Sequence, residues 1–342
     1  MRAPTFLAIL LFSSASFAQA ASPSRAPPAR PPPLPRSAEA RVELARQRVA
    51  ADDTNGFEAI FRTLPRRIQS RPDVQWLATR AQWTTLSLAI EPGSVRQEPP
   101  AAQASVETIA RATASWLATH ADDADAWMLT ARIHVVRAQL DDALAAYQRV
   151  TQLRPRDPVA WNDRAMVEVA LRRLPSAEQS LVSATQWSGA DATPHANLGA
   201  VRLARGDAAR AIPAFERAAE LEPTRAQHHA DLGSARLAAG DARVAVADYR
   251  RASALAPQDG VILSNLGYAL SMAGQSDEAL VTLRRAVAIS PRGVGGWDNL
   301  AGVLARSGDT RGAIDALNHA LAVDPTDARA RAHLDALTRP AH

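Results

Sequence analysis

The stretch ATPHANLGAVRLARGDAARAIPAFERAAELEPTR, residues 192–225, is followed directly by a second stretch of the same length and pattern at 226–259. Each contains a Leu-Gly pair, then Gly-Asp, a central Ala, a large side chain and a closing Pro. The pattern recurs, with substitutions, every 34 residues from 124 to 327. A period of this length is typical of proteins that stack many copies of one small helical unit. We therefore expect an all-α protein that presents a surface.

Residues 192–225 predict two helices joined by a tight turn. The first helix should end at Gly206, which can adopt the left-handed conformation, and Asp207 can accept hydrogen bonds at the start of the second. Pro223 should end the second helix, because proline has no N–H and clashes with the preceding turn. Gly199 lets the two helices approach closely, and Phe215 fills the remaining gap. One hairpin buries too little apolar area to fold alone, so neighbouring hairpins must stack.

The consensus resembles the tetratricopeptide repeat: a large residue, then Leu-Gly, Gly-Asp, Ala, an aromatic residue, Ala and Pro. The resemblance implies a right-handed α-solenoid of helical hairpins. Six copies are expected, at 124–157, 158–191, 192–225, 226–259, 260–293 and 294–327. The second copy departs from the pattern at Pro175 and at Gly189, where proline is expected. Residues 328–338 should form a polar capping helix, because Arg331 stands where a large apolar residue is usual.

The N-terminal residues 1–20 have the three parts of a secretory signal peptide: Arg2, an apolar stretch and an Ala-Gln-Ala cleavage site. Cleavage is expected before Ala21, and an uncleaved anchor is the alternative. Residues 21–37 form a proline-rich linker, expected to be extended, with a docking motif as the alternative. After the leader is removed, the mature chain is not expected to be stably inserted in a membrane. We therefore expect a periplasmic or secreted bacterial protein.

Residues 38–123 are less regular. They predict helices at 38–50, 56–68, 72–90 and 104–120, with a loop at 91–103. We interpret this part as a degenerate helical region of the same repeat type, with a separate small helical domain as the alternative.

Charge and cysteine content exclude several classes of function. The chain has no Lys and no Cys, and its formal net charge is +4. Acidic residues alternate with Arg throughout, so we expect no basic stripe and no nucleic-acid partner. Without cysteine there are no disulfides, no thiolate metal sites and no lipid-modified N-terminal Cys.

The resemblance implies that the first helices line a concave groove. One groove position repeats every 34 residues and carries side chains able to bond the backbone of an extended peptide: Asp163, Asn197, Asp231, Asn265 and Asn299. The alternative is that these side chains only cap or bond locally. Tyr and Met at the groove would add adaptable contacts, and Arg would hold carboxylates. These further groove residues are Arg132, Met166, Tyr268, Met272, Asp298 and Arg306. The family's carboxylate clamp needs Lys, which is missing.

No catalytic motif is present, and we expect neither an enzyme nor a cofactor. His195, His228 and His229 could suggest zinc, but two of them occupy the position that holds Trp in other copies. We expect partly buried aromatic side chains there and no metal.

These observations predict a non-catalytic scaffold that binds a protein or peptide partner in an envelope complex during pilus, secretion or polysaccharide-export assembly. Residues 263–292 are similar to repeats of tight-adherence and type IV pilus assembly proteins, which are usually lipoproteins. The alternative is a regulatory or substrate-recruiting subunit of a separately encoded envelope enzyme.

Overall fold

The computed structural model describes residues 34–35, 37–87 and 98–338. This described part contains 18 helices and no strand, which confirms the all-α prediction. It divides after Trp187 into two compact units. The expected signal peptide and most of the expected linker lie outside the described residues. Among the described helices, none is long and apolar enough to cross a membrane.

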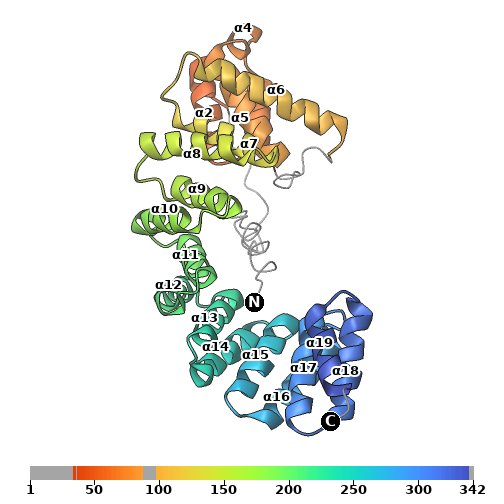
Figure 1. Ribbon diagram of the computed structural model, residues 1–342. Coiled ribbons are helices and arrows are strands. Elements are labelled where there is room, and N and C mark those ends of the chain that lie inside the picture. The colour runs from red at the N-terminus through yellow and green to blue at the C-terminus, as the bar shows by residue number, and fades with distance from the viewer. Residues whose placement is uncertain (1–33, 36, 88–97, 339–342) are drawn as a thin grey trace. The chain divides into compact units, whose positions relative to one another are not determined.

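The first unit begins with five helices of unequal length and continues with two regular hairpins (Figure 1). The helices are α2 (Ala38–Ala50), α3 (Thr54–Phe61), α4 (Arg66–Gln69), α5 (Pro72–Ser87), α6 (Pro100–Leu117), α7 (Ala124–Val136), α8 (Leu140–Leu153), α9 (Pro158–Ala170) and α10 (Leu174–Trp187). Tryptophans build part of the core, where Trp76 stacks on Trp116 with ring centroids 5.5 Å apart.

Two predictions for this unit are wrong in detail. The helix expected at 56–68 is broken, because α3 ends at Phe61 and a separate turn of helix begins after Pro65. The loop expected at 91–103 is too long, because α6 already begins at Pro100. Proline is favourable at the first helical position, where its missing N–H costs nothing. Residues 88–97 lie outside the described part.

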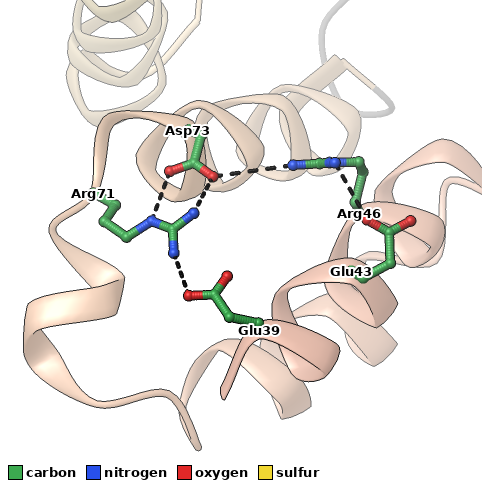
Figure 2. A network of polar contacts seen from close by, with 5 residues as sticks. All are labelled: Glu39, Glu43, Arg46, Arg71 and Asp73. Atoms are coloured by element: carbon green, nitrogen blue, oxygen red, sulfur yellow. Dashed lines mark hydrogen bonds and ion pairs between the residues drawn. The ribbon is translucent and has the colours of Figure 1, made fainter. Parts of the chain in front are cut away.

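A network of charged side chains joins α2 to the start of α5, as Figure 2 shows. Arg71 makes two bonds to Asp73, of 3.0 and 2.8 Å, and one of 2.7 Å to Glu39. Arg46 reaches both Glu43 and Asp73. The Arg71 side chain lowers the pKa of Asp73. Arg71 and Asp73 are half-buried and the other three residues are exposed, so each ion pair contributes little to stability.

The second unit consists of four hairpins and one final helix (Figure 1, green to blue). Its helices are α11 (Thr193–Ala204), α12 (Ala208–Leu221), α13 (Ala226–Ala238), α14 (Ala242–Leu255), α15 (Gly260–Met272), α16 (Ser276–Ile289), α17 (Val294–Arg306), α18 (Thr310–Val323) and α19 (Ala328–Thr338). Each first helix contacts the second helix of its own hairpin and the first helix of the next from α11 to α17.

Glycines mark the closest approach within three of these hairpins. A Cβ added at Gly199 would lie 2.8 Å from the Phe215 ring, and one at Gly233 would lie 2.9 Å from the Tyr249 ring. At Gly267 the added Cβ would lie 2.4 Å from Leu283 Cγ. Real carbon atoms pack at about 3.5–4.0 Å. The expected pairing of a small residue with a large one is therefore confirmed.

The turn inside each hairpin of the second unit requires a left-handed residue. The four glycines there have φ between 80° and 92°, at Gly206, Gly240, Gly274 and Gly308. The equivalent positions of the first unit's two hairpins hold Ala138 and Arg172, with φ of 58° and 61°. A residue with a side chain is strained in this conformation by about 1–2 kcal/mol. These two turns are therefore less favourable than the others.

In four of the six regular hairpins, the large residue near the start of the first helix makes a hydrogen bond that the sequence does not reveal. Trp297 Nε1 donates to the main-chain oxygen of Pro291, six residues earlier, at 2.9 Å. His229 Nε2 lies 3.0 Å from the equivalent oxygen of Pro223. In the first unit, Trp127 and Trp161 donate in the same way. We call the accepting group the closing carbonyl of the preceding repeat.

Two arginines donate a hydrogen bond to the closing carbonyl in repeats that have no aromatic residue at the Trp position. Arg331, at the Trp position of α19, donates to Pro325 oxygen at 2.5 Å. In the repeat that begins at Gly260, the Trp position holds Leu263, which has no donor, and Arg285 of α16 reaches Pro257 oxygen at 2.5 Å instead. Arg331 therefore does more than supply polarity to the capping helix.

Candidate functional site

The first helices of the second unit place the repeated polar position on one row. Asn197, Asp231, Asn265 and Asn299 lie on α11, α13, α15 and α17, which contact one another in that order. Because the residues are 34 apart, each occupies the same place on its helix. We call this set the amide row. Its equivalent in the first unit is Asp163 on α9.

The members of the amide row differ in how many partners they already have. Asn299 Nδ2 donates to Ser264 Oγ at 3.1 Å, and Gln227 Nε2 donates to Asp231 Oδ1 at 2.7 Å. Asn197 is buried, with an exposed fraction of 3%. Asn265 is half-buried and makes no hydrogen bond within the described structure. An unpaired amide of this kind has both a donor and an acceptor to offer a ligand backbone.

Burial also affects the acidic member of the row. It raises the pKa of Asp231 to about 6, against the smaller opposing effect of the Gln227 hydrogen bond. Asp231 therefore carries a full negative charge only above neutral pH.

An exposed apolar strip runs along α15 beside the amide row. Val261, Tyr268 and Met272 have exposed fractions of 67%, 39% and 57%. Their spacing of seven and four residues places them on one side of the helix. The two positions on α17 that match Val261 and Tyr268 hold Gly295 and Gly302. The surface is therefore higher over the side chains of α15 than over the glycine backbone of α17. We call this change in height, with Tyr268 and Met272 on one side and Gly302 on the other, the step.

Arg306 lies at the edge of this step. Its Nη1 atom is 3.6 Å from where a Gly302 Cβ would be, and its Nη2 atom donates to Ser271 Oγ of α15. The side chain thus extends from α17 toward α15 over the space left by Gly302. It forms no ion pair within the described residues, so its charge is available to a ligand.

Asp298 was expected to line the groove and face a partner, but the structure buries it. Its exposed fraction is 3%, and its carboxylate lies 2.6 Å from Arg329 Nε and 3.0 Å from His333 Nδ1 of α19. The residue joins the capping helix to the last hairpin. The two partners are 31 and 35 residues further along the chain, the same separations as in the Arg132–Asp163 and Ser264–Asn299 bonds.

The expected groove residues of the first unit mostly satisfy one another. Arg132 Nη2 and the Tyr147 hydroxyl donate to Asp163 Oδ2 at 3.3 and 3.4 Å. Burial raises the pKa of Asp163, and the positive charge of Arg132 opposes this. Met166 has an exposed fraction of only 7%, so it belongs to the core and not to a binding surface as expected.

The three histidines do not converge on one site. His195 Nε2 lies 3.3 Å from Ser188 Oγ, His228 is buried beside Glu222, and His229 faces the closing carbonyl. Burial lowers the pKa of both His195 and His228. Within the described residues, no group of three or more His, Cys, Asp or Glu is arranged to hold a metal.

Comparison with known proteins identifies the class. The family model described as tetratricopeptide repeat matches residues 96–158, 131–197, 196–259 and 230–294, which together cover more than half of the chain. The chain belongs to the tetratricopeptide repeat family. Its fold and its family indicate a protein-interaction scaffold. A search among curated proteins found no match.

Solved structures of the same fold resemble the chain at low sequence identity. A chain of the APC/C hetero-tetramer Cut9-Hcn1 is 16% identical, with a TM-score of 0.53; the match covers 89% of this chain and 56% of that one. YrrB, described as a TPR protein with an unusual peptide-binding site, is 19% identical, with a TM-score of 0.45 over 55% of this chain and 97% of its own. MamA from Desulfovibrio magneticus RS-1 is 18% identical, with a TM-score of 0.46 over 50% of this chain and 97% of its own.

Proposed function

We propose that this chain is an exported scaffold that binds an extended peptide segment of a partner protein across the amide row of the second unit. The observation that carries the proposal is Asn265, the third of the four members of that row, whose amide makes no hydrogen bond within the described residues. Asn299 on the neighbouring helix keeps its side-chain oxygen available, because only its nitrogen bonds Ser264. Amides in such a row can bond the N–H and C=O groups of a ligand regardless of its side chains.

The proposed setting is the bacterial cell envelope, during assembly of a pilus, secretion or polysaccharide-export complex. The leader-like residues 1–20 and the proline-rich spacer that follows support export. Export is tested by N-terminal sequencing of the protein from a periplasmic fraction. A chain that begins at Ala21 is the expected result, and an intact leader in the cytoplasm would contradict it.

Site-specific photo-crosslinking tests the binding surface. A photoreactive amino acid replaces Asn265 in one variant and Arg251, an exposed residue of α14, in a control. We expect partner adducts from position 265 and none from position 251, and mass spectrometry then identifies the crosslinked segment. Adducts of equal yield at the two positions would show that the amide row is not the binding surface.

Replacing Asn265 and Asn299 together by Ala provides an independent check. We expect weaker capture of the crosslinked partner with an unchanged helical circular dichroism spectrum. Asn197 is left intact, because its burial makes its replacement a test of folding and not of binding.

A further inference from the structure

The partner segment can be described more closely from the step between α15 and α17, if the chain binds a peptide as proposed above. First helices of neighbouring hairpins pack at about 10 Å. An extended peptide advances about 3.3 Å per residue. A segment that crosses the amide row therefore places about three residues over each helix. One side chain of every such group can enter the space beside Tyr268 and Met272.

The step is shaped for an apolar side chain. Tyr268 and Met272 of α15 have exposed fractions of 39% and 57%, so within the described residues part of each side chain remains open to a ligand. On the α17 side, Gly302 has no side chain, so only its backbone borders the space next to Tyr268 and Met272. The nearest atom to a Cβ at that position is the Arg306 guanidinium, at 3.6 Å.

Arg306 adds charge selectivity at the same place. Ser271 Oγ accepts one of its N–H groups and holds the guanidinium near α15, next in sequence to Met272. The remaining N–H groups of the guanidinium have no acidic partner in the described structure. A carboxylate would complement them, and charge-assisted bonds of this kind are stronger than neutral ones.

We propose that the second unit selects an extended segment in which an apolar residue, packed on Tyr268 and Met272, lies one or two positions from an Asp or Glu that pairs with Arg306. The distance of one or two positions follows from the reach of Arg306 back to α15, which brings its charge next to the apolar strip. The same surface disfavours a basic residue at that place.

Selection from a random dodecapeptide display library on the full chain tests this proposal. Enriched peptides are synthesised with the acidic residue as Glu, Gln or Lys, and their affinities are measured by fluorescence anisotropy. We expect the Glu peptide to bind about tenfold more tightly than the Gln peptide. Arg306→Glu should reverse the order and favour the Lys peptide. The control Arg251→Glu makes the same charge change on α14 and should leave the order unchanged.

A second pair of variants acts without removing Arg306. Gly302→Glu places a carboxylate four residues before Arg306 on the same helix, where the two can pair. We expect it to remove the preference for the Glu peptide, whereas Gly302→Gln, of the same size, should retain it. Both variants replace a half-buried helical glycine whose added Cβ would meet only the Arg306 guanidinium, at 3.6 Å, so folding should persist and can be verified by circular dichroism.

The outcomes separate this inference from the proposed function. Enriched peptides that lose affinity for the Asn265→Ala, Asn299→Ala double variant, but bind equally well with Glu or Gln, would overturn the inference and leave the function standing. A library that yields no binder, or binders insensitive to the double variant, would overturn both.

Discussion

Gly267 offers a direct test of how closely the helices of a hairpin pack. A Cβ at this position would lie 2.4 Å from Cγ of Leu283, whose exposed fraction is 0%. Normal contacts between carbon atoms are about 3.5–4.0 Å, so even one added carbon overlaps by more than about 1 Å. Leucine adds three more carbons, and a fully buried Leu283 has no free space into which it can turn.

The size of the effect follows from two opposing terms. Overpacking a well-packed core costs about 1–3 kcal/mol, and a whole isobutyl group should reach the upper end of that range. Replacing a helical glycine regains about 1 kcal/mol of helix propensity. We therefore expect Gly267→Leu to lower the free energy of unfolding by about 2 kcal/mol.

Gly302→Leu is the matched control, because it makes the same change in the next first helix at a site with room. There we expect a gain of about 1 kcal/mol, and the two variants should thus differ by about 3 kcal/mol. Urea unfolding followed by circular dichroism at 222 nm measures both. If the two variants share one urea midpoint, the close approach at Gly267 is not a packing constraint and the reasoning fails.

Three further predictions concern strain, pH and buried charge. Ala138→Gly should raise the free energy of unfolding by about 1 kcal/mol in the same urea assay, since it relieves a left-handed residue with φ of 58°. Asp231 in the folded state keeps a proton that the unfolded chain, with a pKa near 3.8, releases, so the stability that it contributes is lost as the pH rises from about 4 to 6. Asp231→Asn should therefore raise Tm relative to the unsubstituted protein at pH 7.5 but not at pH 4, and an equal difference at both values would count against the raised pKa. Arg164→Met removes the ion-pair partner of Glu168, whose exposed fraction is 2%, and should cost about 3 kcal/mol in thermal unfolding. Adding Glu168→Met to that variant should restore much of the loss, and a double variant as unstable as the single one would refute the argument.

The hairpins could be predicted because each rests on contacts that recur at fixed spacing. Gly199 and Phe215 are 16 residues apart, and the same small-to-large pair appears at Gly267 and Leu283. The left-handed turn at Gly206 was predictable for the same reason, because few residues other than glycine adopt it without strain. Contacts within one hairpin and the conformation of its turn thus determine most of the fold.

The surface was harder to predict, because it depends on how repeats face one another. Met166 was expected at the surface but is buried. Asp298 was expected to face a partner, yet Arg329 and His333 of the capping helix enclose it. The separations of these pairs recur in other repeats, as in the Arg132–Asp163 and Ser264–Asn299 bonds, but the residue types at the two ends change from repeat to repeat. A periodic pattern gives the position of a side chain on its helix, and the neighbours that cover it come from elsewhere in the chain.

The helix predicted at 56–68 is wrong for a different reason, because the observed helix α3 ends before Pro65. Pro65 stands inside the stretch expected as one helix, and its position alone could have indicated the interruption, because proline in a helix interior removes a hydrogen bond. Apolar periodicity on both sides concealed it.

The closing carbonyl carries a lesson for recognising distant members of this class. Tryptophan, histidine and arginine all satisfy it, and Arg285 does so from the opposite helix of the hairpin. Within this chain the position therefore requires a proton donor of adequate reach, and side chains of different shape supply it. A sequence profile that scores only large aromatic residues at this position will miss repeats in which an arginine makes the hydrogen bond. Where the position holds a residue without a donor, as at Leu263, we expect related chains to keep a donor at the position of Arg285.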